Sequence, residues 1–125
     1  MTLESQVVQA NEYELADTAD AFVEAITALA DRTEREGHPG VLGYRFYVNR
    51  AEQTAGAVIP YEDAGAWRAH HPVAYPWGEM PALQATALLK RLILLGPLNE
   101  EIQGLIEGAP FQVVRFDTLA SGFVR

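Results

Sequence analysis

Several residue types are scarce or missing in this sequence of 125 residues, and each absence narrows what the protein can do. There is no cysteine, which excludes disulfides, thiolate metal ligands and a cysteine nucleophile. Serine occurs only at Ser5 and Ser121, and neither lies in the Gly-x-Ser-x-Gly turn of serine hydrolases. Because a chain without cysteine suits a reducing compartment, we expect a cytoplasmic location.

Positive charge and long apolar runs are also lacking. Seventeen Asp and Glu outnumber nine Lys and Arg, which gives a formal net charge of −8. An acidic surface repels phosphate backbones and anionic lipids, so neither nucleic acid nor a membrane surface is expected as a partner. No basic segment precedes an apolar stretch at the N-terminus. The apolar run near residue 95 is interrupted by Gly96 and Pro97 and is too short to span a bilayer.

Apolar residues are plentiful, and their spacing predicts an α+β fold. Hydrophobic residues make up 49% of the chain, enough for one domain over residues 1–125 with its own core. Alternating or β-rich segments predict strands, and helical spacing with capping residues predicts helices. The expected strands are Val7–Leu15, Val41–Asn49, Thr54–Tyr61 and Phe111–Leu119. The expected helices follow Asp17 or Thr18, Asp63 (ending before Pro72), Pro81 (reaching Ala87) and Asn99.

This order of elements favours an antiparallel sheet with helices on one face. The chain is too short to supply a second layer of helices for the other face. A second copy of the sheet would cover it, because exposed apolar faces are usually buried in two-fold dimers. We therefore expect a homodimer formed through the sheet faces.

Two segments resemble a known family. The pattern "HPGVLGYRFYVNR", followed by "AGAVIPYEDAGAWRAHH", is similar to the dimeric α/β-barrel proteins of the antibiotic-biosynthesis-monooxygenase type. Such proteins have a glycine-led second strand, a third strand that ends in an aromatic and an acid, and a helix with Ala-x-x-x-His. Here these features fall on Gly43–Asn49, on Tyr61 with Glu62, and on Ala66–His70.

The later "LLGPLNEEIQGLIEGAPFQVVRF" resembles small uncharacterised members of the same family. In those members a strand precedes the short last helix, so the resemblance implies that Lys90–Leu95 is a strand. It also implies a ferredoxin-like fold and a dimeric α/β barrel. The family includes cofactor-independent oxygenases of quinol-like aromatic compounds, haem-degrading enzymes and members without known activity.

The haem-degrading branch uses an Asn on the first strand, then a Trp and a His on the helix after the third strand. Asn11 matches the first position, but His70 falls where the Trp belongs and Met80 lies near the His position. Haem is therefore not expected, and the resemblance implies no other cofactor.

The adjacent residues His70 and His71 are the clearest candidates for chemistry. On a helix they would point about 100° apart, and no spacing of metal ligands accompanies them, so no metal site is expected. His70 shares a helix face with Trp67, where a neutral imidazole could accept a proton from a phenol or quinol. The alternative is that His70 bonds to a free carbonyl at the helix end while Trp67 belongs to the core.

Asn11 is the second expected catalytic residue, because amides inside a strand need partners and a ligand can be one. It or Arg45 would stabilise a developing oxyanion. If the strand face of Asn11 meets the partner sheet instead, Asn11 would form hydrogen bonds across the dimer interface. The remaining expected ligand contacts are Trp67, Tyr61, His71 and Trp77. The loop containing Tyr75 and Trp77 could be a lid over the ligand or a dimer arm.

Two functions follow from these features. One is a small-molecule pocket that oxygenates a phenol-like or quinol-like compound without a cofactor, and the other is a dimeric binding or scaffold protein without catalysis. An open, partly polar cavity lined by His70 and Asn11 would favour chemistry. A cavity filled by Trp67, Phe22 and Ile26 would favour the scaffold.

Overall fold

A five-stranded sheet in the order β2-β3-β1-β4-β5 forms the centre of the molecule. The structure is a computed structural model that describes residues 2–125, with Glu101 described by its backbone alone. The strands are β1 (Val7–Leu15), β2 (Arg45–Asn49), β3 (Thr54–Tyr61), β4 (Ala87–Leu95) and β5 (Gln112–Phe116). The helices are α1 (Ala19–Glu36), α2 (Ala64–Ala74), α3 (Glu79–Gln84) and α4 (Glu100–Ile106), with a short 3₁₀ turn at Leu3–Ser5.

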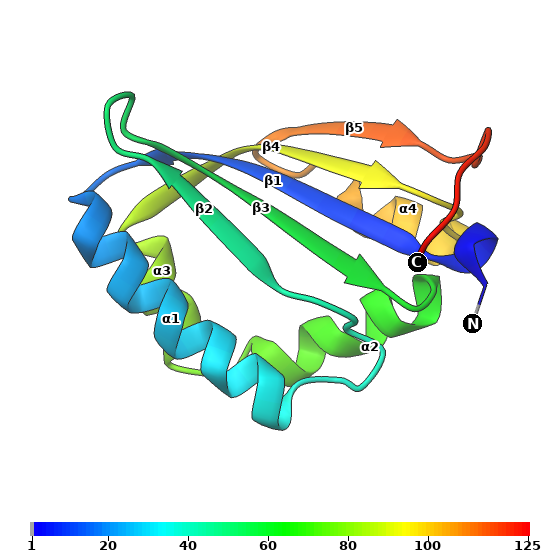
Figure 1. Cartoon of the computed structure of the whole chain (residues 1–125), viewed down its shortest axis with the longest axis horizontal. Helices are drawn as coiled ribbons and strands as arrows, with labels where there is room; N and C mark the ends of the chain where they lie inside the picture. Colours follow the sequence, from blue (N-terminus) through cyan, green and yellow to red (C-terminus); the bar gives the residue numbers. More distant parts are fainter. Residues whose placement is uncertain (1) are drawn as a thin grey trace.

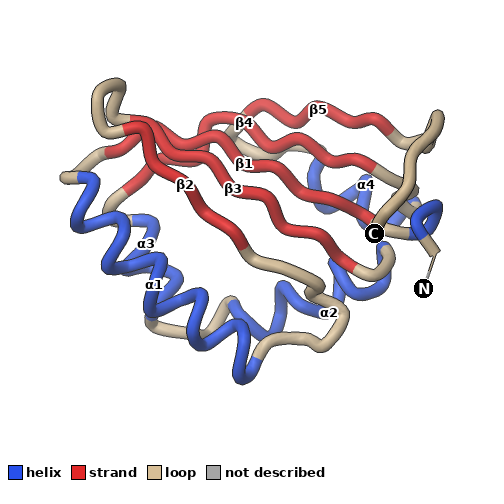
Figure 2. The backbone as a smooth tube through the Cα atoms, in the orientation of Figure 1, coloured by secondary structure: helices blue, strands red, loops and turns tan. Residues whose placement is uncertain are grey.

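The helices pack along one face of the sheet, which confirms the predicted α+β, ferredoxin-like arrangement (Figures 1 and 2). On β3, residues alternate between buried and half-buried positions, with Ala55, Ala57, Ile59 and Tyr61 buried. This period of two places every second side chain against the helices. The first helix contributes Phe22, Ile26 and Leu29 to the core at the spacing of one helical face.

Strand β1 is central, and it pairs antiparallel with both β3 and β4. Its bounds and those of β3 agree with the sequence prediction. Three predicted helix caps are also present, because the side chains of Thr18, Asp63 and Asn99 each accept a bond from a backbone N–H three residues later.

The last strand differs from the predicted antiparallel arrangement, because β5 runs parallel to β4. A parallel neighbour requires a connection that returns to the starting end of the sheet, and the segment containing α4 provides it (Figure 1). Strand β5 ends at Phe116, before the predicted end at Leu119.

Other element boundaries also differ from the prediction, and α3 begins at Glu79, before the expected first helical position at Pro81. Strand β2 begins at Arg45, because residues near Val41 make only an isolated bridge to Tyr61. Helix α2 continues through Pro72 to Ala74. Helix α3 ends at Gln84, and Ala87 begins a strand instead of ending a helix, since it pairs with Leu15 at the end of β1.

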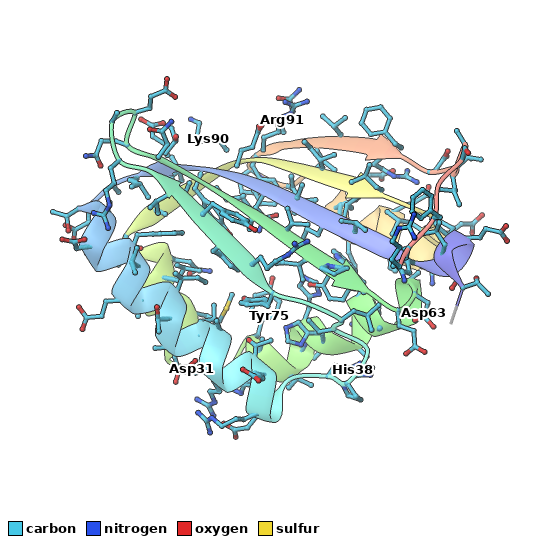
Figure 3. All side chains as sticks on the ribbon, viewed as in Figure 1. Asp31, His38, Asp63, Tyr75, Lys90 and Arg91 are labelled. Carbon is cyan, nitrogen blue, oxygen red and sulfur yellow. The ribbon has the colours of Figure 1, made fainter. Side chains whose placement is uncertain are left out.

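The face of the sheet away from the helices is called the outer sheet face here. At one end it carries charged pairs, including Arg91 with Glu12 and Lys90 with Glu14, and Figure 3 shows Lys90 and Arg91 pointing away from the helices. The rest of this face includes the exposed Arg45 on β2 but is mostly apolar. Its apolar residues are half-buried or exposed, and they are Val8, Ala10, Tyr47, Val58, Pro60, Ile93, Leu95, Val114 and Phe116.

Candidate functional site

A cavity of about 260 Å³ lies between the sheet and the helices. Its polar lining comes from β1, from the end of β3, from α2, from Tyr44 before β2 and from Gln84 of α3, and its apolar lining includes Leu29, Phe46 and Met80. Of the described residues that line it, none is Asp, Glu, Lys or Arg. In a chain of net charge −8, a cavity without ionised carboxylates or cations fits a neutral ligand, because an ion would lack a partner there.

The cavity is small for a ligand site, since such pockets usually measure roughly 300–1,000 Å³. Its size therefore matches a compound of one or two rings. Tyr75 at the end of α2 lies at its margin, between the sheet and α1 (Figure 3). This side chain is 68% exposed although it lines the cavity, so it stands where a ligand would enter.

Helix α2 places both candidate histidines in the cavity lining. Asp63 caps its first turn through a 2.7 Å bond from the Ala66 N–H. His70 is 4% exposed, and its ring lies 6.3 Å from that of Tyr61. His71 is less buried, and its ring packs 4.2 Å from that of Trp67.

Burial controls the charge of these groups. It lowers the pKa of His70 from 6.5 to about 4, and the neighbouring His71 and His38 act in the same direction. Burial also lowers the pKa of His71, against an opposing effect from the Trp67 carbonyl. Both rings are therefore neutral at pH 7.

A chain of hydrogen bonds connects the core to the cavity. The Trp67 indole Nε1–H donates to Gln9 Oε1 at 2.8 Å, and Gln9 Nε2–H donates to Asn11 Oδ1 at 2.9 Å. Asn11 Nδ2–H in turn donates to the hydroxyl oxygen of Tyr13 at 2.9 Å. All three strand residues lie on one face of β1, at a period of two. We call these four residues the amide chain.

The amide chain has a direction, and it ends on a donor. Because the Tyr13 oxygen already accepts from Asn11, its own O–H hydrogen remains to donate to a ligand. Successive bonds of this kind polarise one another. Burial raises the pKa of Tyr13, so the hydroxyl keeps its proton at neutral pH.

The structure brings together four of the seven residues expected from the sequence. Asn11, Tyr61, His70 and His71 line the cavity, while Trp67 stands behind it as the first member of the amide chain. The bond that was considered for His70, to a carbonyl of its own helix, is made by His71 instead, with the Trp67 carbonyl.

Two expected contacts lie elsewhere. Arg45 is exposed on the outer sheet face, because its neighbour Phe46 is the residue that points toward the helices. Trp77 is 7% exposed, and its ring lies under the Arg32 guanidinium at 4.7 Å. It therefore belongs to the core between α1 and α3, and is neither lid nor dimer arm in the chain described here.

Tyr13 and Tyr44 line the cavity and were not expected to do so. The position of Tyr13 on the same strand face as the two amides was a usable signal. Tyr44 precedes β2 in an irregular segment, and nothing in the local sequence indicates that its ring packs 4.9 Å from that of Phe46.

Among the side chains that the structure describes, no three of His, Asp or Glu come together as metal ligands. No described helix is both long enough and apolar enough to cross a membrane.

Comparison of this arrangement with solved structures identifies the class of fold. MupZ from Pseudomonas fluorescens superposes with a TM-score of 0.70 at 19% identity, over 98% of this chain and 93% of that one. SnoaB, a cofactor-independent oxygenase from Streptomyces nogalater, gives a TM-score of 0.61 at 18% identity, over 72% of this chain and 90% of its own.

A protein from Caulobacter crescentus, provisionally assigned as an antibiotic biosynthesis monooxygenase, gives a TM-score of 0.59 at 16% identity, over 73% of this chain and 86% of its own. No protein-family description and no curated protein matches the sequence. The three structural likenesses confirm the predicted resemblance at the level of the fold, which is that of the antibiotic-biosynthesis-monooxygenase-like proteins.

Proposed function

We propose that the protein binds a small, uncharged aromatic compound with an acidic hydroxyl group and oxygenates it without a cofactor. The observation that carries this proposal is the cavity itself, which is open, free of charged side chains and lined by His70 and Asn11. The core residues Phe22 and Ile26 belong to α1 and do not line the cavity, so they leave it unfilled. The likeness in fold to SnoaB, a cofactor-independent oxygenase, supports the same reaction class.

The proposed reaction needs only molecular oxygen as a second substrate. A histidine of the cavity takes the hydroxyl proton, and the resulting anion carries electron density onto a ring carbon that still bears hydrogen. That carbon donates electrons to oxygen and forms a peroxide, which loses water to leave a carbonyl. One oxygen atom is kept, and the other leaves as water with two substrate hydrogens. The protein binds the ring, accepts the proton and stabilises the anion.

The test is a panel of phenols, quinols and naphthols. A true ligand is expected to raise the melting temperature with concentration, and a substrate is expected to consume one O₂ per quinone formed in an oxygen electrode, also after treatment with a chelator. Ligands that stabilise the protein without oxygen uptake would instead identify a binding protein that is not an enzyme. If no aromatic compound raises the melting temperature, the proposed ligand class is wrong.

We also propose that two copies pair through their outer sheet faces. The nine apolar residues of that face come from all five strands, and Tyr47 and Phe116 are 59% and 58% exposed. Such a continuous apolar surface favours association with a second, identical sheet.

A further inference from the structure

The two adjacent histidines differ in which ring nitrogen carries the proton. His71 Nδ1 lies 2.6 Å from the carbonyl oxygen of Trp67, one helical turn earlier. A carbonyl oxygen can only accept, so this contact requires a hydrogen on Nδ1. In the neutral ring, the lone pair of His71 is therefore on Nε2, the nitrogen farther from the helix backbone.

His70 has the opposite arrangement. The backbone N–H of His38 donates to His70 Nδ1 at 3.4 Å, so the hydrogen of the neutral ring is on Nε2. A second bond fixes the segment that makes this contact, because Gly40 N–H donates to His38 Nδ1 at 2.9 Å. The segment also packs tightly against α2, since a side chain at Gly40 would collide with Ala66. His70 therefore offers the cavity a donor, and not an acceptor.

Together, His71, His70 and Tyr13 supply one basic nitrogen and two donors to the lining, beside the hydroxyls of Tyr44 and Tyr61 and the amide of Gln84. The donors are His70 Nε2–H and the hydroxyl of Tyr13, which is the end of the amide chain. The basic nitrogen is His71 Nε2. Proton transfer from a hydroxyl group requires this combination, in which a base receives the proton while donors stabilise the oxygen left behind.

We propose that His71, through Nε2, accepts the hydroxyl proton of the bound ligand, and that Tyr13 and His70 donate hydrogen bonds to the resulting anion. The ligand O–H bond breaks, an N–H bond forms on His71, and the pair becomes an imidazolium and a phenolate. This inference rests on the proposed function and specifies its site. It assigns to His71 the role that the sequence suggested for His70.

Trp67 stabilises the charged form of His71 through the carbonyl that holds its Nδ1–H, and this contact raises the pKa of His71 against the effect of burial. His70 has no such carbonyl partner in the part of the chain that is described, and its two histidine neighbours disfavour its protonation. The other titratable groups around His71 are Arg68 on its own helix, Tyr61 on β3 and Tyr75 beyond the helix end.

The two tautomers can be observed directly. The chain has only three histidines, so ¹⁵N-labelled histidine gives three sets of ring signals, which substitution of His38, His70 and His71 in turn would assign. Above pH 7, in the absence of ligand, we expect His71 to be protonated on Nδ1 and His70 on Nε2. If His71 carries its proton on Nε2, the proposal is overturned, whatever the protein does to aromatic compounds.

Two matched substitutions test the roles on any substrate found with the panel. His71→Asn keeps a donor for the Trp67 carbonyl but has no base, and should lower kcat by about 10²–10⁴-fold, the usual contribution of a general base. His70→Gln keeps an N–H donor in place of Nε2–H and should lose less than about tenfold, because Gln retains this hydrogen bond. The reverse order of effects would overturn the assignment. Absence of turnover in the unmodified protein would contradict the proposed reaction, and the tautomers would still decide the assignment.

Discussion

Trp67 connects the core to the cavity through one indole hydrogen bond. In Trp67→Phe, the buried Gln9 Oε1 loses its donor, so we expect the free energy of unfolding to fall by about 1–3 kcal/mol beyond the loss of ring volume. Urea denaturation measures this change. In a Gln9→Met background the hydrogen-bond part of the loss should disappear. An equal loss in both backgrounds would show that the indole bond contributes nothing.

Burial of the neutral His70 should make stability depend on pH. Its pKa falls from 6.5 to about 4 on folding, so between these values the unfolded chain binds more protons than the folded one. Above about pH 6.5, His70 does not reduce the free energy of unfolding. As the pH falls below this value, the free energy of unfolding decreases, by a loss that approaches about 3 kcal/mol near pH 4. Burial of His71 acts in the same direction.

Urea midpoints measured from pH 7.5 to about pH 4 test this prediction, and carboxylates that titrate near pH 4 add their own slope. The variant His70→Gln provides the control, because it should remove most of the slope above about pH 5. A wild-type slope equal to that of the variant would contradict the burial of a neutral imidazole.

At the scale of single residues, the sequence indicated several residues that line the cavity but not the protonation of their ring nitrogens. Asn11, His70 and His71 could be placed because their types are rare on strand and helix faces that turn inward. The tautomers could not be predicted, since they depend on the His38 N–H and the Trp67 carbonyl. Arg45 was misplaced because the sequence does not say which face of β2 meets the helices.

Among the elements, the turn after β4 has the least tolerance for change. Gly96 has φ +119°, and a side chain there would collide with the carbonyl oxygen of Gln6. Gly96→Ala should therefore lower the free energy of unfolding by at least about 1–3 kcal/mol from backbone strain alone. Gly104 in α4 has open space around it, so Gly104→Ala should raise stability by up to about 1 kcal/mol. Thermal denaturation of both variants compares them, and similar effects would contradict this account.

Element boundaries were predictable where local signals and pairing agree. Strand β3 ends where predicted, because its alternation and its partner β1 specify the same residues. Pro72 normally ends a helix, since it removes a backbone donor. Here the burial of Ala74 and Trp77 beyond it outweighs that cost. The segment after α3 is rich in Ala and Leu, which favour helix, but pairing with β1 makes it a strand.

For the whole molecule, the outer sheet face predicts a dimer. We expect light scattering to give about twice the chain mass of 13.7 kDa. Ile93 lies in the middle of this face, paired with Ala10 and Val114, so Ile93→Lys should give a monomer. Ala28→Lys places the same charge on the exposed side of α1 and should leave the dimer intact. A wild-type monomer at high concentration would contradict pairing through this face.

The overall architecture followed from the sequence with one exception, the direction of β5. The order of the predicted elements indicated one sheet with helices on one face, but the direction of a final strand depends on how the preceding connection packs. Nothing local to Gln112–Phe116 distinguishes a parallel from an antiparallel neighbour.

The late position of β5 in the chain matters during synthesis. Until β5 has emerged from the ribosome, β4 has no neighbour on one side, and its backbone is open next to the apolar run Leu92–Leu95. An unpaired strand of this kind recruits other chains and forms aggregates. Nascent or prematurely terminated copies that lack residues 112–116 are therefore expected to depend on chaperones, whereas the finished protein protects this strand by itself.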